Sequence, residues 1–456
     1  MTSITNEPHV AVLAFPFGTH AAPLLTVIRC LSKAAPNVHF SFFNTAESNT
    51  MIFSNSNNDA VKAYNVSDGV PDKYVFTGKH QENIELFMKA APENFWKGIE
   101  AAVAETGRKV SCLVTDGFFW FAAEMAEEMG VPWVPFWAGG PHSLSTHVLT
   151  DFIRDKVGAG GIGGREEEPL TFIPGMSKLR LRDLPEGILA GNLNSIFSTM
   201  LHKMGKMLPQ ATAVFINFFE ELDPTLTNDL NSKFKKFLNV GPFNLLSLSP
   251  PPSTPDANNC LSWLNDQKAE SVAYISFGRV ATPPPTEILA IADALEASGV
   301  AFLWSLKDHS KVHLPKGFLD KTRASGMVVP WAPQLQILAH GAVGVFVTHC
   351  GWNSVLESIG GGVPMICRPF FGDHKVNTRM VEAVWEIGIK IDGEMFTKNG
   401  LISSLDLVLS QEKGKKMRGH IRGLKGLAEK AVGPQGSSTK NLKTLLSLVS
   451  RPKDIA

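Results

Sequence analysis

Residues 331–374 bring together the polar groups that could hold a nucleotide diphosphate. An apolar, β-branched run over residues 341–348 predicts a strand, and it leads directly into His349-Cys350-Gly351-Trp352-Asn353-Ser354. A helix is expected over residues 354–359. A strand, a tight glycine turn and a helix start direct backbone N–H groups and the positive end of the helix dipole at an anion. The pattern therefore predicts a diphosphate site.

The same segment offers groups for the rest of a nucleotide sugar. Trp331 provides a flat face for a base, and such stacking contributes about 1–3 kcal/mol. Glu357, one turn into the expected helix, has a carboxylate that can accept both ribose hydroxyls. Asp373 and His374 end the segment after a second apolar run, residues 363–371. They are expected at the carboxyl edge of a parallel sheet, where open α/β sheets bind ligands.

A second group of residues could perform proton transfer. His20 follows the first apolar run of the chain, and an imidazole at a sheet edge suits a general base that removes a proton from a hydroxyl. Asp116 ends another apolar run, so its carboxylate could orient His20 and stabilise the imidazolium. The two residues are distant in sequence, and their pairing is a hypothesis.

Alternating strand and helix patterns divide the chain into two α/β halves. In the first half a helix is expected over residues 22–35, and strands are expected at residues 9–16, 38–44, 111–115, 131–136 and 213–217. Residues 247–259 are rich in Pro, Ser and Asn, which predicts a linker. The pattern then restarts with strands at 271–277 and 301–306 around a helix at 285–297. The predicted fold is α/β, with two facing Rossmann-like domains, residues 1–246 and 260–440, and a cleft between them.

Composition narrows the class of function. The 456 residues carry 43 positive and 43 negative side chains, which argues against a nucleic-acid surface or an anionic membrane as partner. The N-terminus lacks a signal-peptide pattern, and no apolar run is long enough to span a membrane. The five cysteines have no metal or disulfide spacing, and no carboxylate cluster predicts a metal site. A cytoplasmic protein with reduced thiols is expected.

One motif points elsewhere and fails in context. Residues 158–163 fit GxGxxG, the fingerprint of nicotinamide-dependent oxidoreductases. They follow no expected strand and precede the acidic stretch 166–168. They are interpreted as a surface loop, which removes the main support for an oxidoreductase.

The segment WAPQLQILAHGAVGVFVTHCGWNSVLESIGGGVPMICRPFFGDH resembles, nearly end to end, the signature of plant family 1 UDP-dependent glycosyltransferases. The resemblance extends over essentially the whole chain. It implies the GT-B fold, with the last helix, residues 441–456, returning to the first domain. It further implies a UDP-sugar as co-substrate, no metal, and an enzyme that is expected to act as a monomer.

The resemblance assigns roles to donor-site residues. Trp331 would stack on uracil, while Gln334 and Glu357 would hold the ribose. The diphosphate would contact His349, Asn353 and Ser354, and the sugar would contact Asp373 and His374. Residues that neighbour these groups complete the predicted donor site: Thr19, Arg279, Ser305, Ala332, Gly351 and Trp352.

The N-terminal half resembles flavonoid 3-O-glycosyltransferases in FPFGTHAAPLL, SDGVPDKYVF, FIPGMSKLRLRDLPEG and AVFINFFEEL. His20 and Asp116 match the catalytic dyad of the family. The acceptor would be a flavonol or an anthocyanidin, glycosylated at its 3-hydroxyl with inversion to a β-glycoside. Acceptor-site residues by this resemblance are Gln81 and His147, which would contact hydroxyls, and Phe15, Phe118, Phe197 and Phe371, which would line the pocket.

Three positions depart from the family pattern. His374 stands where glucosyl-transferring members usually have Gln, and some galactosyl-transferring members have His there. This favours UDP-galactose as donor, with UDP-glucose as the alternative. Ala138 replaces a Thr expected near the sugar 6-hydroxyl, and Arg279 replaces a small hydroxyl residue, where it could pair with the diphosphate or face solvent. A non-catalytic UDP-sugar-binding protein is the alternative outside this class.

Overall fold

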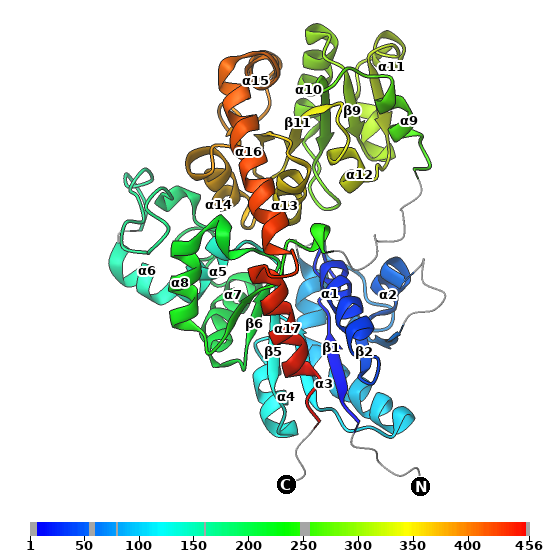
Figure 1. The fold of residues 1–456 in the computed structure, drawn as a ribbon, viewed down its shortest axis with the longest axis vertical. Coiled ribbons are helices and arrows are strands. Elements are labelled where there is room, and N and C mark those ends of the chain that lie inside the picture. Colours follow the sequence, from blue (N-terminus) through cyan, green and yellow to red (C-terminus); the bar gives the residue numbers. More distant parts are fainter. Residues whose placement is uncertain (1–6, 54–59, 79–80, 159–160, 247–255, 453–456) are drawn as a thin grey trace.

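The computed structural model describes residues 7–53, 60–78, 81–158, 161–246 and 256–452. Two α/β domains lie one above the other, with the N-terminal domain at the lower end in Figure 1. Of the predicted linker 247–259, residues 247–255 lie outside the described residues. The fold-class prediction, two Rossmann-like domains, is confirmed.

The N-terminal domain is built on a seven-stranded sheet in the order β3-β2-β1-β4-β5-β6-β7. Every pair is parallel, and all strands except the edge strand β3 are buried along most of their length, as expected where helices cover both faces. The strands are β1 (His9–Leu13), β2 (His39–Thr45), β3 (Val61–Val66), β4 (Cys112–Asp116), β5 (Trp133–Trp137), β6 (Val214–Ile216) and β7 (Phe237–Asn239).

Helices and short helical turns connect these strands. They are α1 (Ala21–Ala34), α2 (Ala46–Phe53), α3 (Glu82–Thr106), α4 (Ala122–Met129), α5 (Pro141–Val148), α6 (Thr150–Val157), η1 (Leu181–Asp183), α7 (Ile196–Met207), η2 (Leu208–Gln210), η3 (Glu220–Leu222), α8 (Pro224–Lys233) and η4 (Phe243–Leu245).

The C-terminal domain has a six-stranded parallel sheet in the order β10-β9-β8-β11-β12-β13. Its strands are β8 (Val272–Ser276), β9 (Phe302–Ser305), β10 (Gly326–Val329), β11 (Val343–Thr348), β12 (Met365–Cys367) and β13 (Gly388–Lys390). Its helices are α9 (Cys260–Asn265), α10 (Pro285–Ser298), η5 (Asp308–His313), α11 (Phe318–Lys321), α12 (Gln334–Leu338), α13 (Trp352–Gly361), α14 (His374–Arg379), the π-helical turn η6 (Met380–Val384), α15 (Lys398–Ser410), α16 (Glu412–Ala431) and α17 (Ser437–Val449).

Two elements around the predicted donor site differ from the sequence expectation. The apolar run 363–371 forms a strand only over Met365–Cys367, because prolines at 364 and 369 flank it and cannot donate to a ladder. The helix expected from residue 354 begins two residues earlier, at Trp352, so that Asn353 and Ser354 lie in its first turn.

The last helix belongs to the first domain. The long helix α16 runs from the C-terminal domain toward the N-terminal domain, and α17 lies against the latter in Figure 1. α17 packs on β7, and its Leu445, Leu448 and Val449 are buried in the same core as Val10 of β1. The helix predicted over residues 441–456 begins earlier, at Ser437, and ends at Val449; residues 453–456 lie outside the described residues.

Removing apolar bulk from α17 tests whether the N-terminal core depends on this returning helix. Leu445 is fully buried, so Leu445→Ala is expected to reduce the free energy of unfolding by about 2–5 kcal/mol, the usual cost of a leucine-sized cavity. Lys443→Ala, at an exposed position of the same helix, is the control and is expected to change it little. Urea denaturation followed by tryptophan fluorescence measures both, and equal effects would contradict the packing role.

Candidate active site

His20 and Asp116 form a hydrogen-bonded pair at the edge of the N-terminal sheet. His20 Nδ1 lies 2.8 Å from Asp116 Oδ2, although the residues are 96 positions apart. The carboxylate side chain is 1% exposed and the imidazole 19% exposed. Since Nδ1 is bound to the carboxylate, Nε2 is the nitrogen available to receive a proton.

The sheet produces this pairing. β1 and β4 are adjacent parallel strands, so the residues that follow their carboxyl ends meet at one edge. Asp116 is the last residue of β4, and His20 immediately precedes α1. The other carboxylate oxygen, Oδ1, accepts from the backbone N–H of Phe118 at 2.9 Å. With both oxygens engaged, the carboxylate is held in a single orientation.

Aromatic side chains surround the imidazole. Phe15 and Phe118 pack on His20 with ring centroids 5.1 and 4.5 Å away. Phe197 of α7 meets Phe118 edge-on at 5.7 Å. His147 is buried and lies 5.9 Å from Trp137, which itself contacts Phe118. Burial lowers the pKa of His147 to about 4, so this imidazole is neutral and can exchange a hydrogen bond with a hydroxyl.

Two predicted acceptor residues, Gln81 and Phe371, lie outside this cluster. Gln81 directly precedes α3 in a left-handed conformation, and Phe87 of that helix packs on Phe15. Phe371 belongs to the C-terminal domain, is 47% exposed and stacks near His374 at 4.7 Å. The structure thus places the predicted acceptor residues on both domains.

The predicted diphosphate site lies between β11 and α13. The chain turns through Cys350, whose φ of 60° is left-handed, and not through Gly351, whose φ is −61°. Gly351 is needed for space, because a Cβ there would lie 2.4 Å from His349 Nε2. Gly278 is needed for the same reason, because a Cβ at this position would lie 2.9 Å from His349 Cε1. Two glycines therefore make room for the His349 imidazole.

His349 is a neutral hydrogen-bonding group in this site. Burial lowers its pKa to about 3, and neighbouring His374, 4.9 Å away between ring centroids, acts in the same direction. Its Nδ1 is buried and has no hydrogen-bond partner within the part of the chain that the structure describes. A buried nitrogen without a partner is costly, so a ligand that satisfies it would be favoured.

A compact network forms the predicted ribose site. Gln334, at the start of α12, donates from Nε2 to Glu357 Oε2 at 2.5 Å and to Ser354 Oγ at 3.1 Å. The hydroxyl of Tyr274 donates to Gln334 Oε1 at 3.2 Å. Burial raises the pKa of Glu357 to about 7, while the amide of Gln334 partly opposes the shift.

Trp331 offers a face at the rim of this network. It is 38% exposed, and its backbone carbonyl accepts from Asn258 Nδ2 at 2.9 Å. Ala332, which follows it, is buried. The exposed indole suits stacking with a planar base.

Asp373 and His374 lie where the two domains touch. Asp373 Oδ2 accepts from the backbone N–H of Gly140 at 3.1 Å, and burial raises its pKa. His374 is buried, which lowers its pKa to about 4. Its Nδ1 accepts from the backbone N–H groups of Phe370 and Phe371 at 3.4 and 3.3 Å. The ring proton therefore resides on Nε2, which makes His374 a donor at that atom.

The other predicted donor residues occupy more peripheral positions. Thr19 is exposed next to His20, and Ser305 ends β9 half-buried. Arg279 is exposed after β8, where its backbone carbonyl accepts from Lys307 Nζ. Ala138 follows β5 and packs partly on the N-terminal core, without a hydroxyl to offer. Trp352 is buried and serves the domain interface.

Sequence reasoning missed three residues of the site. Gly140 supplies the N–H that holds Asp373, and Tyr274 supports Gln334. Asn217 joins the domains: its backbone carbonyl accepts from Trp352 Nε1 at 2.8 Å, and its Nδ2 lies 3.3 Å from Asn353 Oδ1. Asn217 stands just after a buried strand, and a polar residue at that point was the available signal.

The described residues offer neither a metal-binding cluster nor a membrane-spanning helix. They contain no group of three or more His, Cys, Asp or Glu side chains placed to hold a metal ion. None of the helices in the same residues is both long and apolar enough to cross a membrane.

Comparison with known proteins identifies the class of this site. Residues 10–421 match the family model described as UDP-glucoronosyl and UDP-glucosyl transferase. This chain belongs to the UDP-glycosyltransferase family. The UDP-glycosyltransferase is 63% identical to an anthocyanidin 3-O-glucosyltransferase of Vitis vinifera, with 100% of each chain covered. It is 56% identical to an anthocyanidin 3-O-galactosyltransferase of Actinidia chinensis var. chinensis, with 99% of each covered.

A solved structure supports the same arrangement. The crystal structure of a UDP-glucose: anthocyanidin 3-O-glucosyltransferase in complex with UDP matches this UDP-glycosyltransferase with a TM-score of 0.91 and 43% identity. The match covers 97% of this chain and 99% of that chain. The GT-B fold expected from the sequence is thereby confirmed.

The pKa of Glu357 predicts a pH dependence of UDP binding. Above about pH 7 the carboxylate is ionised and can accept both ribose hydroxyls; below it, the proton occupies one acceptor. The affinity for UDP is therefore expected to rise from pH 6 to pH 8 by up to about tenfold. His349 and His374 stay neutral over this range and contribute no change.

Calorimetric titration of wild type and Glu357→Gln with UDP measures this dependence. Glu357→Gln is expected to weaken binding at pH 8 by roughly ten- to hundredfold, the value of hydrogen bonds to a charged group. In Glu357→Gln any pH dependence that comes from ionisation of UDP itself remains, so this variant is the control for that contribution. An equal pH dependence in both proteins would exclude Glu357 as its source.

Proposed function

We propose that this UDP-glycosyltransferase transfers a hexose, with inversion, from a UDP-sugar to the 3-hydroxyl of a flavonol or an anthocyanidin. UDP-galactose is the favoured donor. The hydrogen bond between His20 and Asp116, next to an aromatic cluster, is the observation that carries the proposal.

The dyad provides the base. His20 Nε2 receives the proton of the acceptor hydroxyl while Nδ1–H remains bound to Asp116. The buried carboxylate stabilises the imidazolium that forms, because a nearby opposite charge favours the charged imidazole. The acceptor oxygen attacks the anomeric carbon from the face opposite the diphosphate. One displacement of this kind converts an α-linked UDP-sugar into a β-glycoside.

The leaving diphosphate is stabilised without a metal ion in this proposal. The N-terminus of α13, with Asn353 and Ser354 in its first turn, presents backbone N–H groups toward the turn that contains His349. His349 contributes a hydrogen bond rather than a charge, since its pKa is about 3. Preorganised donors of this type act on charge as it develops.

The acceptor pocket suits a flat aromatic molecule. Phe15, Phe118 and Phe197 present edge-to-face contacts around His20, and such aromatic pairs contribute about 0.5–1.5 kcal/mol each. Neutral His147 and Gln81 provide hydrogen-bonding groups for hydroxyls. The names of the relatives from Vitis vinifera and Actinidia chinensis, both anthocyanidin 3-O-glycosyltransferases, support this acceptor class.

The donor sugar depends on few hydrogen bonds. Galactose and glucose differ only in the orientation of the 4-hydroxyl, so the site must discriminate by polar contacts. His374 has its proton on Nε2 and offers a fixed donor there, whereas a Gln would offer both a donor and an acceptor. This fixed donor favours UDP-galactose.

UDP-glucose is the second candidate donor. The 63% identical relative from Vitis vinifera is named as a glucosyltransferase, and the 56% identical relative from Actinidia chinensis as a galactosyltransferase. In either case the proposal describes a monomeric cytoplasmic enzyme that uses the UDP-sugar as co-substrate.

Removing the base separates an enzyme from a non-catalytic binding protein. His20→Ala is expected to lower kcat by about 10²–10⁴-fold, the usual contribution of general base catalysis, while the Kd for UDP stays unchanged. His202→Ala removes a different histidine of the same domain, paired with Asp151, and is the matched control with full activity. Wild type that binds UDP but transfers no sugar would support the binding-protein alternative.

Replacing His374 tests the donor assignment. In wild type, kcat/KM is expected to be higher with UDP-galactose than with UDP-glucose. His374→Gln is expected to shift that ratio toward UDP-glucose by about tenfold, the value of one or two hydrogen bonds. Lys375→Gln, at the adjacent exposed position, is the control and should leave the ratio unchanged. A wild-type preference for UDP-glucose would reassign the donor while leaving the fold and the base intact.

A further inference from the structure

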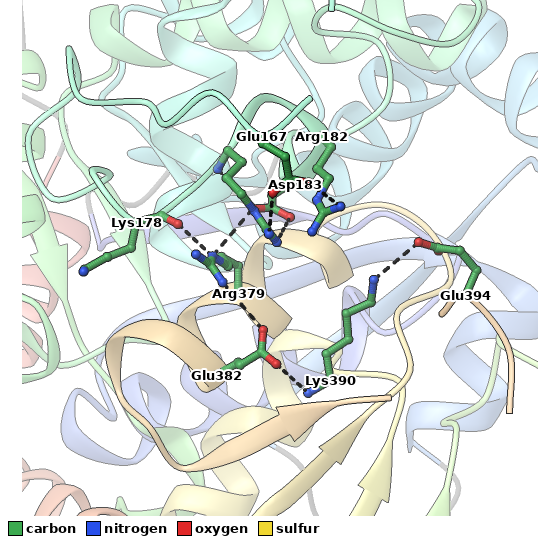
Figure 2. Close-up of polar contacts among 9 residues, drawn as sticks. Glu167, Lys178, Arg182, Asp183, Arg379, Glu382, Lys390 and Glu394 are labelled. Atoms are coloured by element: carbon green, nitrogen blue, oxygen red, sulfur yellow. Dashed lines mark hydrogen bonds and ion pairs between the residues drawn. The ribbon is translucent and has the colours of Figure 1, made fainter. Parts of the chain in front are cut away.

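Arg379, the last residue of α14, reaches across the domain boundary. Its Nε donates to the backbone carbonyl of Lys178 in the N-terminal domain at 2.7 Å, and Nε lies 3.9 Å from Asp183 Oδ2. Within its own domain, Nη1 lies 3.7 Å from Glu382. Figure 2 shows the guanidinium between the loop that contains Lys178 and the carboxylate of Glu382. Arg379 thus connects the two domains through a backbone carbonyl and a carboxylate.

The N-terminal partner of Arg379 is itself held in place. Asp183 ends η1, and its side chain is 9% exposed. Its Oδ2 accepts from the backbone N–H of Arg180 at 3.0 Å and from Nε of the same residue at 2.9 Å. Its Oδ1 accepts from Arg180 Nη2 at 3.1 Å. The loop therefore presents a fixed surface to Arg379.

α14 is anchored at its other end as well. Asp373, directly before the helix, accepts from Gly140 N of the N-terminal domain at 3.1 Å. In the middle of the helix, Asn377 Nδ2 donates to the carbonyl of Cys350 at 3.0 Å, in the turn next to His349. A six-residue helix is thus held at both ends by the other domain and at its centre by the diphosphate turn. His374 is its first residue.

A cavity of about 70 Å³ separates the two sides of this contact. Four of the five cationic side chains that line it are paired with carboxylates of their own domain: Arg180 with Asp183, Arg182 with Glu167, Arg379 with Glu382, and Lys390 with Glu394. Lys375 is the fifth cation, so most of the positive charge around the cavity is already compensated. The link between the domains at this cavity comes from Arg379, through Lys178 and Asp183.

We infer that Arg379 is a positioning residue for the donor sugar. By holding the C-terminal end of α14 against the N-terminal domain, it keeps Asp373 and His374 aligned with the sugar when the two domains face each other. This inference rests on the proposed donor site, because it requires that these two residues contact the sugar and not the nucleotide.

The helix is short enough to transmit a displacement. At about 1.5 Å per residue, the five steps from His374 to Arg379 span less than two turns, so the helix moves as a unit. The chain continues from Arg379 into the π-helical turn η6, so the guanidinium lies at a junction between two helix types. A small shift of bound sugar relative to the base can cost a large factor in rate.

Arg379→Gln with Lys390→Gln as a matched control tests the inference. Both side chains line the same cavity and are 22% and 26% exposed, but Lys390 pairs only with Glu394 of its own domain. The measurements are Kd for UDP, UDP-galactose and UDP-glucose by calorimetry without acceptor, followed by kcat and KM with acceptor.

Arg379→Gln is expected to leave the Kd for UDP within about twofold, as for independent sites. It is expected to weaken binding of the preferred UDP-sugar and to lower kcat/KM by roughly ten- to hundredfold. Lys390→Gln should resemble wild type in every measurement. Arg379→Lys keeps the charge but not the planar guanidinium, so its ratio of the Kd for the preferred UDP-sugar to the Kd for UDP should lie between those of wild type and Arg379→Gln. This variant tests the inference if Arg379→Gln does not fold.

Other outcomes overturn the inference. Equal weakening of UDP and UDP-sugar would indicate a general loss of structure, and no change in either would show that the contact does not position the sugar. A matching loss in Lys390→Gln would point to the cavity as a whole. Failure of the proposed function would be seen separately, as wild type that transfers nothing to a flavonol or an anthocyanidin while the Kd ratio still responds to Arg379→Gln.

Discussion

The contact between Asn217 and the start of α13 is the constraint on which the site depends. The backbone carbonyl of Asn217 accepts from the indole of Trp352, and its Nδ2 donates to Asn353. Its Oδ1 accepts from the backbone N–H of Phe243. Both polar atoms of the side chain and the backbone carbonyl are therefore hydrogen-bonded. Trp352 also packs near Phe218 with a centroid distance of 6.0 Å. A buried amide therefore joins the N-terminal sheet to the helix whose N-terminus faces the diphosphate site.

This contact fixes how the two domains lie relative to each other, so residues of both domains can form one site. In the proposed function the N-terminal domain contributes the base and an aromatic pocket, and the C-terminal domain contributes the nucleotide segment. Asp373 and Gly140, together with Arg379 and Lys178, add two further contacts around α14. A reaction between two bound substrates requires such fixed relative placement, because orientation supplies a large part of catalysis.

Burial determines which groups in the cleft carry charge. His349 and His374 lie near each other with pKa values of about 3 and 4, so neither is protonated at neutral pH. In the proposed mechanism they act as directional hydrogen-bonding groups, while the helix terminus provides the electrostatic attraction for a diphosphate. His20 differs because its Nδ1 is hydrogen-bonded to the buried carboxylate of Asp116, which fixes the orientation of the ring. The same residue type thus performs two functions in one cleft, according to its neighbours.

The sequence by itself determined the α/β class, most strand positions, the nucleotide segment and the candidate dyad. These follow from local patterns, namely apolar runs that end in polar residues and the continuous motif over residues 331–374. Even so, the apolar run 363–371 is longer than the strand that it forms, because the flanking prolines restrict that strand to Met365–Cys367. Only the tertiary structure decided that His20 and Asp116 are hydrogen-bonded, and that Asn217, Gly140 and Arg379 connect the domains. Such contacts join residues 96 to 233 positions apart, and their geometry arises from strand order and domain packing, which no local pattern encodes.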